Sequence, residues 1–367
     1  MRFGQGNRLD LLKRFKEKGR NTVKERNFYI DFIKGLAIIL VIVGHSIQYG
    51  FGQSYLENEL FFDNWIFRFI YGFHMPLFML ISGYCFYYST KSNSCVIILK
   101  KKIIGFLVPV FVFSILNYAI KVVGIGWSGS LINAVKEYVF TFVGTIWFLW
   151  AVFYCSIVVL VVHFKLQDNL FYTLLLIIII YLFVPDGFNL KMSKYLLPYF
   201  CAGYFWNVNS KKMTGIGLLH KNRLIKAIVF GIVVTVYMIG IDFYSKDVSI
   251  YRSDLSITSL YGIGCTMFRL IMGIAGSVIL LIIGKYLYQI CGDKMKNIIV
   301  SMGVNSLGIY IVNIYYAQYV HGFLAESLPV SWMSVLLQVM LSIFVCGAVA
   351  LLIHKNRILR FVVFGGR

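Results

Sequence analysis

The sequence predicts an all-α polytopic membrane protein with about ten transmembrane helices and both termini in the cytoplasm. Three observations predict this fold class: the composition, the long apolar stretches and the placement of the basic residues. Of the 367 residues, 59% are hydrophobic and 14% are charged, with a mean hydropathy of +0.77, whereas soluble proteins carry roughly 25% charged residues. Such a chain cannot cover itself with a water-compatible surface, which excludes a soluble cytosolic enzyme.

Ten apolar stretches approach the length that a membrane crossing requires. A transmembrane helix needs about 20 mostly apolar residues, because each residue rises about 1.5 Å through a hydrocarbon core about 30 Å thick. The sixth stretch is short and contains Pro198 and Gly203, so we expect a kink or a partly buried segment there. The ten predicted spans are residues 28–50, 65–88, 103–122, 140–162, 169–185, 194–208, 225–242, 259–284, 298–319 and 331–353.

The distribution of lysine and arginine predicts the orientation, because basic loops tend to remain on the cytoplasmic side. With the amino terminus inside, the cytoplasmic segments hold 26 of the 35 lysines and arginines, the outer loops hold six and the spans hold three. Ten spans return the carboxyl terminus to the inside, where four of these 26 basic residues lie. Both termini are therefore predicted to be cytoplasmic.

Composition divides the chain into three parts. Residues 1–27 are predicted to form a basic cytoplasmic amphipathic segment, residues 28–354 the membrane domain and residues 355–367 a basic cytoplasmic tail. Residues 8–20 suit either a basic amphipathic helix on the anionic inner leaflet or a disordered basic tail that helps to fix the topology. The first span is expected to be retained. The net charge of +20 indicates membrane lipid as a partner and no nucleic acid, since no nucleic-acid motif is present.

The cysteines are scattered singly, without a CxxC pair and without a histidine at metal-ligand spacing. We interpret them as small apolar residues within helices and expect no metal. The seven are Cys85, Cys95, Cys155, Cys201, Cys265, Cys291 and Cys346.

The first predicted span contains three ionisable residues, Asp31, Lys34 and His45, and such groups within a membrane usually face a cavity. Lys34 and His45 are eleven residues apart, which is within roughly 20° of three full helical turns, so they share one face about 16 Å apart along the axis. Asp31 lies one turn below Lys34 and can pair with it. The alternative is structural: Asp31 and Lys34 neutralise each other and His45 satisfies a buried contact.

The second predicted span carries Arg68 and His74. His74 is expected about 14 Å below the outer end of its helix, close to the level of His45. The two histidines are therefore predicted to meet in the outer half of one cavity. Pro76 invites a kink in this span, and Ser82-Gly83 permits the close approach of another helix or of a ligand.

These two spans carry a resemblance to a known family. The run from Arg26 to Ala37, leading to Gly44-His45, resembles the first helix of the acyltransferase-3 family of integral membrane acyltransferases, whose mark is a basic residue followed after ten residues by histidine. The run Phe73-His74-Met75-Pro76-Leu77-Phe78-Met79-Leu80-Ile81-Ser82-Gly83 is similar to its second signature. Weaker echoes are Lys100-Lys101-Lys102 with Pro109, Ile146-Trp147-Phe148-Leu149-Trp150, Leu197-Pro198-Tyr199-Phe200 with Gly203, and Asn305-Ser306-Leu307-Gly308-Ile309-Tyr310.

The resemblance covers residues 26 to about 315 and has departures. Lys34 stands where arginine is commoner, Met79 where phenylalanine is usual and Asn313 where many relatives carry histidine. Lysine keeps the charge but lacks the guanidinium fork, so this residue is not expected to clamp a phosphate through two parallel hydrogen bonds.

The resemblance implies a membrane O-acyltransferase in the cytoplasmic (inner) membrane of a bacterial-type cell. It implies transfer of an acyl group, usually acetyl, from acyl-CoA to a hydroxyl of a cell-surface or lipid-linked carbohydrate. Acetyl-CoA is then the donor and the carbohydrate the acceptor. Lys34 and Arg269 are expected to hold the donor, and Asp31 to hold Lys34 in place. Pairing of Arg269 with another span is an equal alternative.

His45 and His74 are the candidate catalytic residues. A buried, neutral His45 can accept the proton of the acceptor hydroxyl, and His74 can orient the acceptor or donate a hydrogen bond to the developing oxyanion. Arg68, Trp147 and Ser82 are candidates for substrate binding. Their structural alternatives are snorkelling of Arg68 to the interface, an interfacial aromatic belt that includes Trp147, and helix packing at Ser82.

Two other functions fit parts of the pattern. A transporter or flippase that exports a glycan or a small anion would use buried cations and broken helices in the same way, but it does not require the paired histidines. A lipid-surface scaffold without chemistry leaves the buried charges unexplained. The formation of a homodimer is left open.

Overall fold

The computed structural model describes residues 27–50, 60–126, 129–209, 223–251, 255, 257, 259–329 and 331–366, and its regular structure in these ranges is entirely helical. The helices are α2 (Phe28–Gly50), η1 (Leu60–Asp63), α4 (Trp65–Tyr71), α5 (His74–Ser92), α6 (Cys95–Lys102), η2 (Ile103–Leu107), α7 (Val108–Ile125), α8 (Leu131–Gly144), α9 (Trp147–Phe164), α10 (Leu170–Phe183), α11 (Leu190–Val208), α14 (Arg223–Phe243), α15 (Leu260–Ile290), α16 (Asp293–Val304), α17 (Ser306–Tyr315), η3 (Tyr316–His321), α18 (Gly322–Ser327), α19 (Trp332–Lys355) and α20 (Arg357–Phe364).

All ten predicted spans are helical, but fewer of them have the length and composition of a full crossing. Among the described residues, seven helices are long and apolar enough to cross a membrane, or eight if the bent pair α16 and α17–η3 counts as one span. The seven are Phe28–Gly50, Trp65–Ser92, Cys95–Gly124, Trp147–Phe164, Arg223–Phe243, Leu260–Ile290 and Trp332–Lys355. The predicted all-helical, multi-pass architecture is confirmed, whereas the count of about ten and the orientation of the termini stay predictions.

Three predicted spans differ from the helices that form. Helix α10 has 14 residues and extends about 21 Å at 1.5 Å per residue, which is less than the hydrocarbon thickness. The predicted span 298–319 is bent by 72° between α16 and α17. The predicted span 140–162 was wrong at its start, because α8 ends at Gly144 and Ile146 adopts a left-handed conformation with φ 47° before α9 begins.

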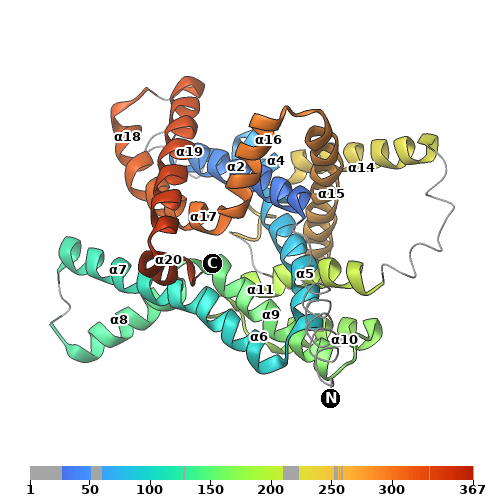
Figure 1. Ribbon diagram of the computed structural model, residues 1–367, viewed down its shortest axis with the longest axis horizontal. Helices are drawn as coiled ribbons and strands as arrows, with labels where there is room; N and C mark the ends of the chain where they lie inside the picture. Colours follow the sequence, from blue (N-terminus) through green and yellow to red (C-terminus); the bar gives the residue numbers. More distant parts are fainter. Residues whose placement is uncertain are drawn as a thin grey trace, which may run out of the picture.

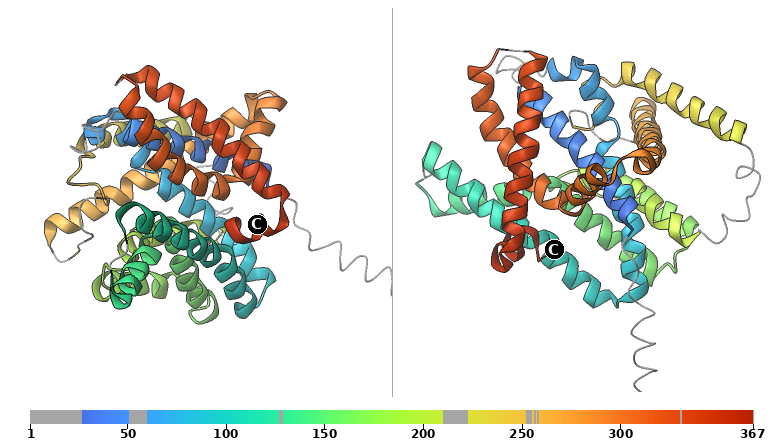
Figure 2. Two further views of the ribbon diagram at one scale, coloured as in Figure 1. Left: turned by 90° about the vertical axis from the view of Figure 1, so that its left-hand side faces the viewer. Right: turned by 45° about the horizontal axis from the view of Figure 1, so that its top comes forward.

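Helices α2 and α5 form the centre of the bundle (Figure 1). Helix α2 packs against α16, α17, α19, α15 and α5, and α5 makes its most extensive contact with α11. The α7–α8 pair extends on one side of this centre and α14 on the other (Figures 1 and 2). The first predicted span, residues 28–50, therefore occupies the middle of the structure.

Glycines bring the central helices into backbone contact. A Cβ at Gly83 of α5 would overlap the carbonyl group of Phe200 on α11, and a Cβ at Gly203 of α11 would overlap that of Leu80 on α5. Ser82-Gly83 was predicted to permit the close approach of another helix or of a ligand. At Gly83 it is helix α11 that approaches, as expected where small residues let membrane helices pack tightly. This contact fixes the position of α5, which carries His74.

Replacing Gly203 with leucine is expected to lower the free energy of unfolding by about 1–3 kcal/mol or more, because α5 and α11 must separate to admit the side chain. Thermal unfolding of the purified protein in detergent measures this loss. Gly231→Leu on α14 is the matched control, because nothing lies within 4 Å of a Cβ built at Gly231. Equal melting temperatures for the two variants would contradict the contact.

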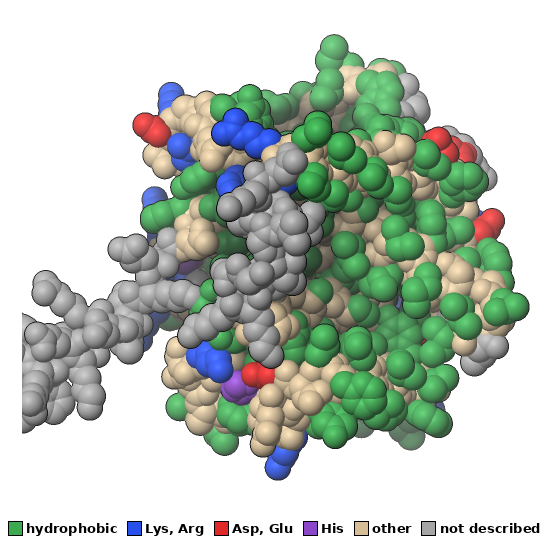
Figure 3. All heavy atoms as spheres, turned by 90° about the vertical axis from the view of Figure 1, so that its right-hand side faces the viewer, with side chains coloured by type: hydrophobic (Ala, Val, Ile, Leu, Met, Phe, Trp, Pro, Cys, Tyr) green, Lys and Arg blue, Asp and Glu red, His purple; other side chains and the backbone are tan. Residues whose placement is uncertain are grey.

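The outer surface is apolar over a broad area. Figure 3 shows one face of the molecule covered largely by hydrophobic side chains, with most of the visible lysines and arginines gathered toward its left-hand side. Exposed apolar residues on α14 and α15 include Ile228, Ile232, Met267 and Ile271. Such an extensive apolar surface is typical of helices that face lipid.

The terminal segments are only partly covered by the structure. Residues 1–26, which make up nearly all of the predicted amphipathic segment, lie outside the described residues. The predicted tail continues as helix α20, whose Phe364 is buried and packs against Gly308 of α17. The seven cysteines are all free.

Candidate active site

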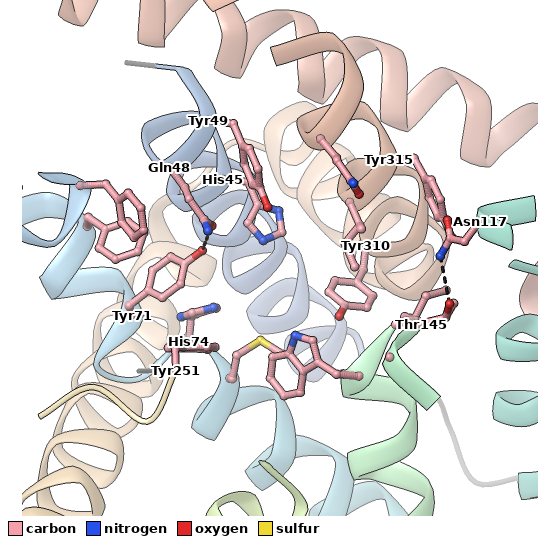
Figure 4. A pocket seen from close by; sticks show the side chains of 18 of the residues that line it. His45, Gln48, Tyr49, Tyr71, His74, Asn117, Thr145, Tyr251, Tyr310 and Tyr315 are labelled. Carbon is pink, nitrogen blue, oxygen red and sulfur yellow. Dashed lines mark hydrogen bonds between the residues drawn. The ribbon is translucent and has the colours of Figure 1, made fainter. Parts of the chain in front are cut away.

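His45 and His74 line the same internal cavity, which has a volume of about 340 Å³. His45 enters from α2, and His74 from the first turn of α5 (Figure 4). Other polar residues on its wall include Gln48, Tyr71 and Tyr310. We call this cavity the histidine chamber.

The hydrogen bonds of Asn313 determine which nitrogen of His45 carries the proton. Nδ1 of His45 lies 2.7 Å from Oδ1 of Asn313, and Nδ2 of Asn313 donates to Oγ of Ser342 at 2.7 Å. The amide lies with its nitrogen toward Ser342 and its oxygen toward the imidazole, where the oxygen can only accept. His45 therefore holds its proton on Nδ1, and Nε2 keeps a lone pair that can accept a proton.

His74 is held in the same tautomer by the backbone. Its Nδ1 lies 2.9 Å from the carbonyl oxygen of Ile70, which is only an acceptor, so Nδ1 is the donor. Nε2 of a neutral His74 then has a lone pair and no hydrogen. This geometry favours His74 as a residue that accepts a hydrogen bond from the acceptor hydroxyl, and it leaves a neutral His74 without a donor for an oxyanion at Nε2.

A second cavity of about 280 Å³ adjoins the first and is lined by Lys34, Lys102 and Ser82. We call it the lysine chamber. Met75 and Tyr310 line both chambers, so these two side chains form the wall that the chambers share. The continuous helix α2 connects Lys34 to His45, with an axial separation of about 16 Å between them.

The predicted ion pair between Asp31 and Lys34 is present, with 3.3 Å between Oδ1 and Nζ. The Asp31 side chain is 6% exposed, whereas that of Lys34 is 27% exposed. Nζ of Lys102 lies 4.6 Å from the ring centroid of Phe86, on the wall of the same chamber, which is within the range of a cation–π contact. The ammonium groups of Lys34 and Lys102, which are far apart in the sequence, therefore line the same chamber.

The two predicted arginines lie elsewhere. Arg269 is buried, and its Nε donates to the carbonyl oxygen of Val248 at 2.6 Å. Arg68 is half-buried, and its Nη1 donates to the carbonyl oxygen of Asp242 at 3.3 Å. Neither arginine lines either chamber, so the expected pairing of Arg269 with Lys34 around one ligand does not form.

The remaining predicted residues lie on the chamber walls. Trp147 lines the histidine chamber and Ser82 the lysine chamber. Sequence reasoning missed the contributions of Lys102, Tyr310 and Asn313, although each appears in a motif or as a departure from one. The spacing of Tyr310 and Asn313 was the available signal, because residues three apart lie on one face of a helix.

Together, the fold and the site define an integral membrane protein with a polar cavity inside its helix bundle. The chain belongs to the acyltransferase-3 family, because the family described as an acyltransferase domain matches residues 27–354. This match confirms the resemblance at the first two spans and extends it over nearly the whole chain.

Two relatives carry the name nodulation protein NolL. The protein from Sinorhizobium fredii (strain NBRC 101917 / NGR234) is 28% identical over 201 residues, which cover 54% of each chain. The protein from Mesorhizobium japonicum (strain LMG 29417 / CECT 9101 / MAFF 303099) is 29% identical over 194 residues, which cover 52% of this chain and 51% of the relative. The matched region thus spans about half the length of these curated relatives. No solved structure matches the chain at a significant level.

Proposed function

We propose that this protein is a membrane O-acyltransferase that moves an acyl group, preferably acetyl, from acyl-CoA to a hydroxyl of a cell-surface or lipid-linked carbohydrate. The observation that carries the proposal is the pair of adjoining chambers, one with two ammonium groups and the other with two imidazole lone pairs. Family membership supports acyl transfer as the chemistry. The donor, the acceptor and the sidedness below are parts of the proposal.

The lysine chamber suits the anionic end of acyl-CoA. Lys34 and Lys102 supply positive charge for its phosphates, with Lys102 in the role that was expected of Arg269. The pantetheine arm is thin and neutral, and its length is comparable with the separation of about 16 Å between Lys34 and His45. The thioester then reaches the wall formed by Met75 and Tyr310.

The histidine chamber suits the chemical step. The acceptor oxygen attacks the thioester carbonyl carbon while its proton passes to Nε2 of His45, and the carbonyl π electrons move onto oxygen. The tetrahedral intermediate re-forms the carbonyl group as the C–S bond breaks. The departing CoA sulfur takes the proton back from His45, so that the products are an ester and a free thiol.

The other wall residues suit a carbohydrate acceptor. The Tyr71 hydroxyl donates to Oε1 of Gln48 at 2.9 Å, and Trp147 adds an aromatic surface to the chamber. Amide and hydroxyl groups satisfy sugar hydroxyls, whereas aromatic faces pack on the apolar face of a sugar ring. His74 accepts a hydrogen bond from the acceptor and thereby orients it.

We further propose that the lysine chamber opens toward the cytoplasm of a bacterial-type cell, where acyl-CoA is made. Residues 1–27 and 355–367 would then be the basic cytoplasmic segments that flank the acyltransferase domain of residues 28–354, facing anionic lipid. Reaction of the amino and carboxyl termini with a membrane-impermeant label in intact and in opened cells tests this orientation. Labelling of either terminus in intact cells contradicts it.

The decisive experiment compares surface polysaccharide from cells with and without the protein. Under the proposal, ester-linked acetyl detected by NMR disappears with the protein while the amount of surface polymer is unchanged. Loss of surface polymer with normal acylation of what remains would instead indicate the transporter or flippase. Transfer of label from [14C]acetyl-CoA to carbohydrate in membrane vesicles tests the donor directly.

Removing the positive charge of Lys102 is expected to raise KM for acetyl-CoA about 10- to 100-fold, because a charge-assisted hydrogen bond contributes about 1.5–3 kcal/mol. Lys102→Met tests one ammonium group. Asp31→Asn/Lys34→Met tests the other without leaving a buried carboxylate unpaired. Lys285→Met is the matched control, since Lys285 is exposed and lines neither chamber. An unchanged KM in both test variants would remove the lysines from the donor site.

A further inference from the structure

The proposed acyl transfer needs a hydrogen-bond donor that the two histidines do not supply. Negative charge develops on the thioester oxygen in the transition state, and aligned donors stabilise it strongly. Both chamber imidazoles hold their single proton on Nδ1, against Asn313 and Ile70. Their Nε2 atoms are acceptors, so the donor has to come from another side chain or from the backbone.

Tyr310 is placed where the thioester is expected. Of the residues that the structure describes, Met75 and Tyr310 alone line both chambers, and methionine has no hydrogen to donate. Tyr310 extends from α17 into the space below His45 (Figure 4). A carbonyl group at the junction of the chambers would meet the tyrosine hydroxyl before any other polar side chain of the shared wall.

The hydroxyl of Tyr310 is buried and donates no hydrogen bond within the described part of the chain. The residue is 6% exposed, and its oxygen lies close to the backbone of Phe148 without a hydrogen bond of normal geometry. A buried polar atom without a partner is unfavourable, so this hydroxyl is available to donate to a ligand. The ring is fixed by an edge-to-face contact with Phe148 at 5.6 Å.

Other tyrosines of the histidine chamber are less suitable. The Tyr71 hydroxyl is committed to Gln48. Tyr315 lines the histidine chamber but not the lysine chamber, and it stacks on Phe113 at 5.0 Å. Tyr315 is therefore not part of the shared wall.

We propose that Tyr310 is a catalytic residue whose hydroxyl donates a hydrogen bond to the thioester oxygen as it becomes an oxyanion. This inference rests on the proposed acyltransferase function. In the forward step the acceptor O–C bond forms, the acceptor proton moves to His45 and the carbonyl electron pair moves to the oxygen facing Tyr310. In the second step that pair re-forms the C=O bond, the C–S bond breaks and the proton moves from His45 to sulfur. Tyr310 keeps its own proton throughout.

Tyr310→Phe is expected to lower the maximal rate of acetyl transfer about 10²- to 10³-fold, as the loss of one oxyanion donor does in other acyl-transfer sites. KM for acetyl-CoA is expected to stay unchanged, because the hydrogen bond strengthens only in the transition state. Tyr286→Phe is the matched control and should retain the wild-type maximal rate, because Tyr286 is exposed and lines neither chamber. Rates are measured as transfer of label from [14C]acetyl-CoA to the carbohydrate of membrane vesicles.

Two further measurements separate catalysis from packing. Thermal unfolding in detergent should give the same melting temperature for Tyr310→Phe and the wild type, since only one oxygen is removed. A fluorinated tyrosine at position 310, whose hydroxyl is a stronger donor, should support a rate different from that of tyrosine. Insensitivity to this replacement would count against the proposal.

The outcomes distinguish a failure of the proposed acyltransferase function from a failure of the proposed role of Tyr310. Wild-type vesicles that transfer no label from acetyl-CoA would overturn the proposed function. Active wild type together with a Tyr310→Phe variant that keeps the wild-type maximal rate, or that changes KM alone, would overturn the role of Tyr310 and leave the proposed function intact. Equal losses in Tyr310→Phe and Tyr286→Phe would also reject a specific role for Tyr310.

Discussion

Replacement of His45 with alanine is expected to lower the rate of acetyl transfer about 10²- to 10⁴-fold, which is the range that a positioned general base contributes. The alcohol of the acceptor is a weak nucleophile, and Nε2 of His45 is the lone pair placed to take its proton. KM for acetyl-CoA should stay unchanged, because Lys34 lies about 16 Å away along α2 and Lys102 lines only the lysine chamber. Transfer of label from [14C]acetyl-CoA in membrane vesicles gives both parameters.

His354→Ala is the matched control for His45→Ala. His354 is near the end of α19 and lines neither chamber, so the same substitution there should leave the rate unchanged. In cells, His45→Ala should abolish ester-linked acetyl while surface polymer persists. Wild-type transfer by His45→Ala, with normal amounts of protein in the membrane, would exclude His45 as the base.

Adding free imidazole to the His45→Ala variant provides a second test of the role of His45. The substitution leaves space in a chamber of about 340 Å³, and free imidazole can occupy it as a replacement base. Partial recovery of the rate by imidazole is expected for a proton acceptor, whereas a histidine that merely supports packing gives no such recovery. His74→Ala should respond less to imidazole, because orientation of the acceptor depends on a fixed side chain.

The part of the site that depends on one helix could be predicted from the sequence. Residues 28–50 were expected to form a helix and do so with the same ends, because an apolar run of that length has few other conformations in a membrane. Within it, helical geometry fixes the relation of Asp31, Lys34 and His45. The ion pair between Asp31 and Lys34 follows from that local geometry.

The contacts between helices could not be predicted in the same way. Lys102 and Arg269 are both basic residues near the membrane domain, and only the packing of the bundle places Lys102 beside Lys34 and ties Arg269 to Val248. The bend between α16 and α17 has the same origin, since Gly303 at the end of α16 is pressed against the backbone of Asp31. Hydropathy alone contains no information about such contacts.

The tautomer of His45 is likewise a property of the assembled bundle. It depends on Asn313 from α17 and Ser342 from α19, which are far from α2 in the sequence. The sequence showed Asn313 only as a departure from the family pattern, at a position where many relatives carry histidine. The structure gives that departure a physical meaning, because an amide held by Ser342 presents its oxygen to His45.

Asn313→Leu is accordingly expected to lower the rate of acetyl transfer on the order of 10³-fold. Without the amide oxygen, His45 is free to place its proton on Nε2 and to rotate, and either change removes the base from the acceptor. The expected loss is smaller than the roughly 10⁴-fold effect of disturbing the orienting carboxylate of a catalytic triad, because an amide adds no negative charge to stabilise the imidazolium. KM for acetyl-CoA should again be unaffected.

The conservative variant Asn313→His decides between orientation and packing. An imidazole at position 313 can accept from Nδ1 of His45 through one nitrogen and donate to Ser342 through the other, so it should recover much of the rate lost in Asn313→Leu. Ser342→Ala should give an intermediate loss, since it releases the amide without removing it. If Asn313→Leu keeps the wild-type rate, or if histidine restores nothing while the melting temperatures agree, then Asn313 does not set the proton position of His45.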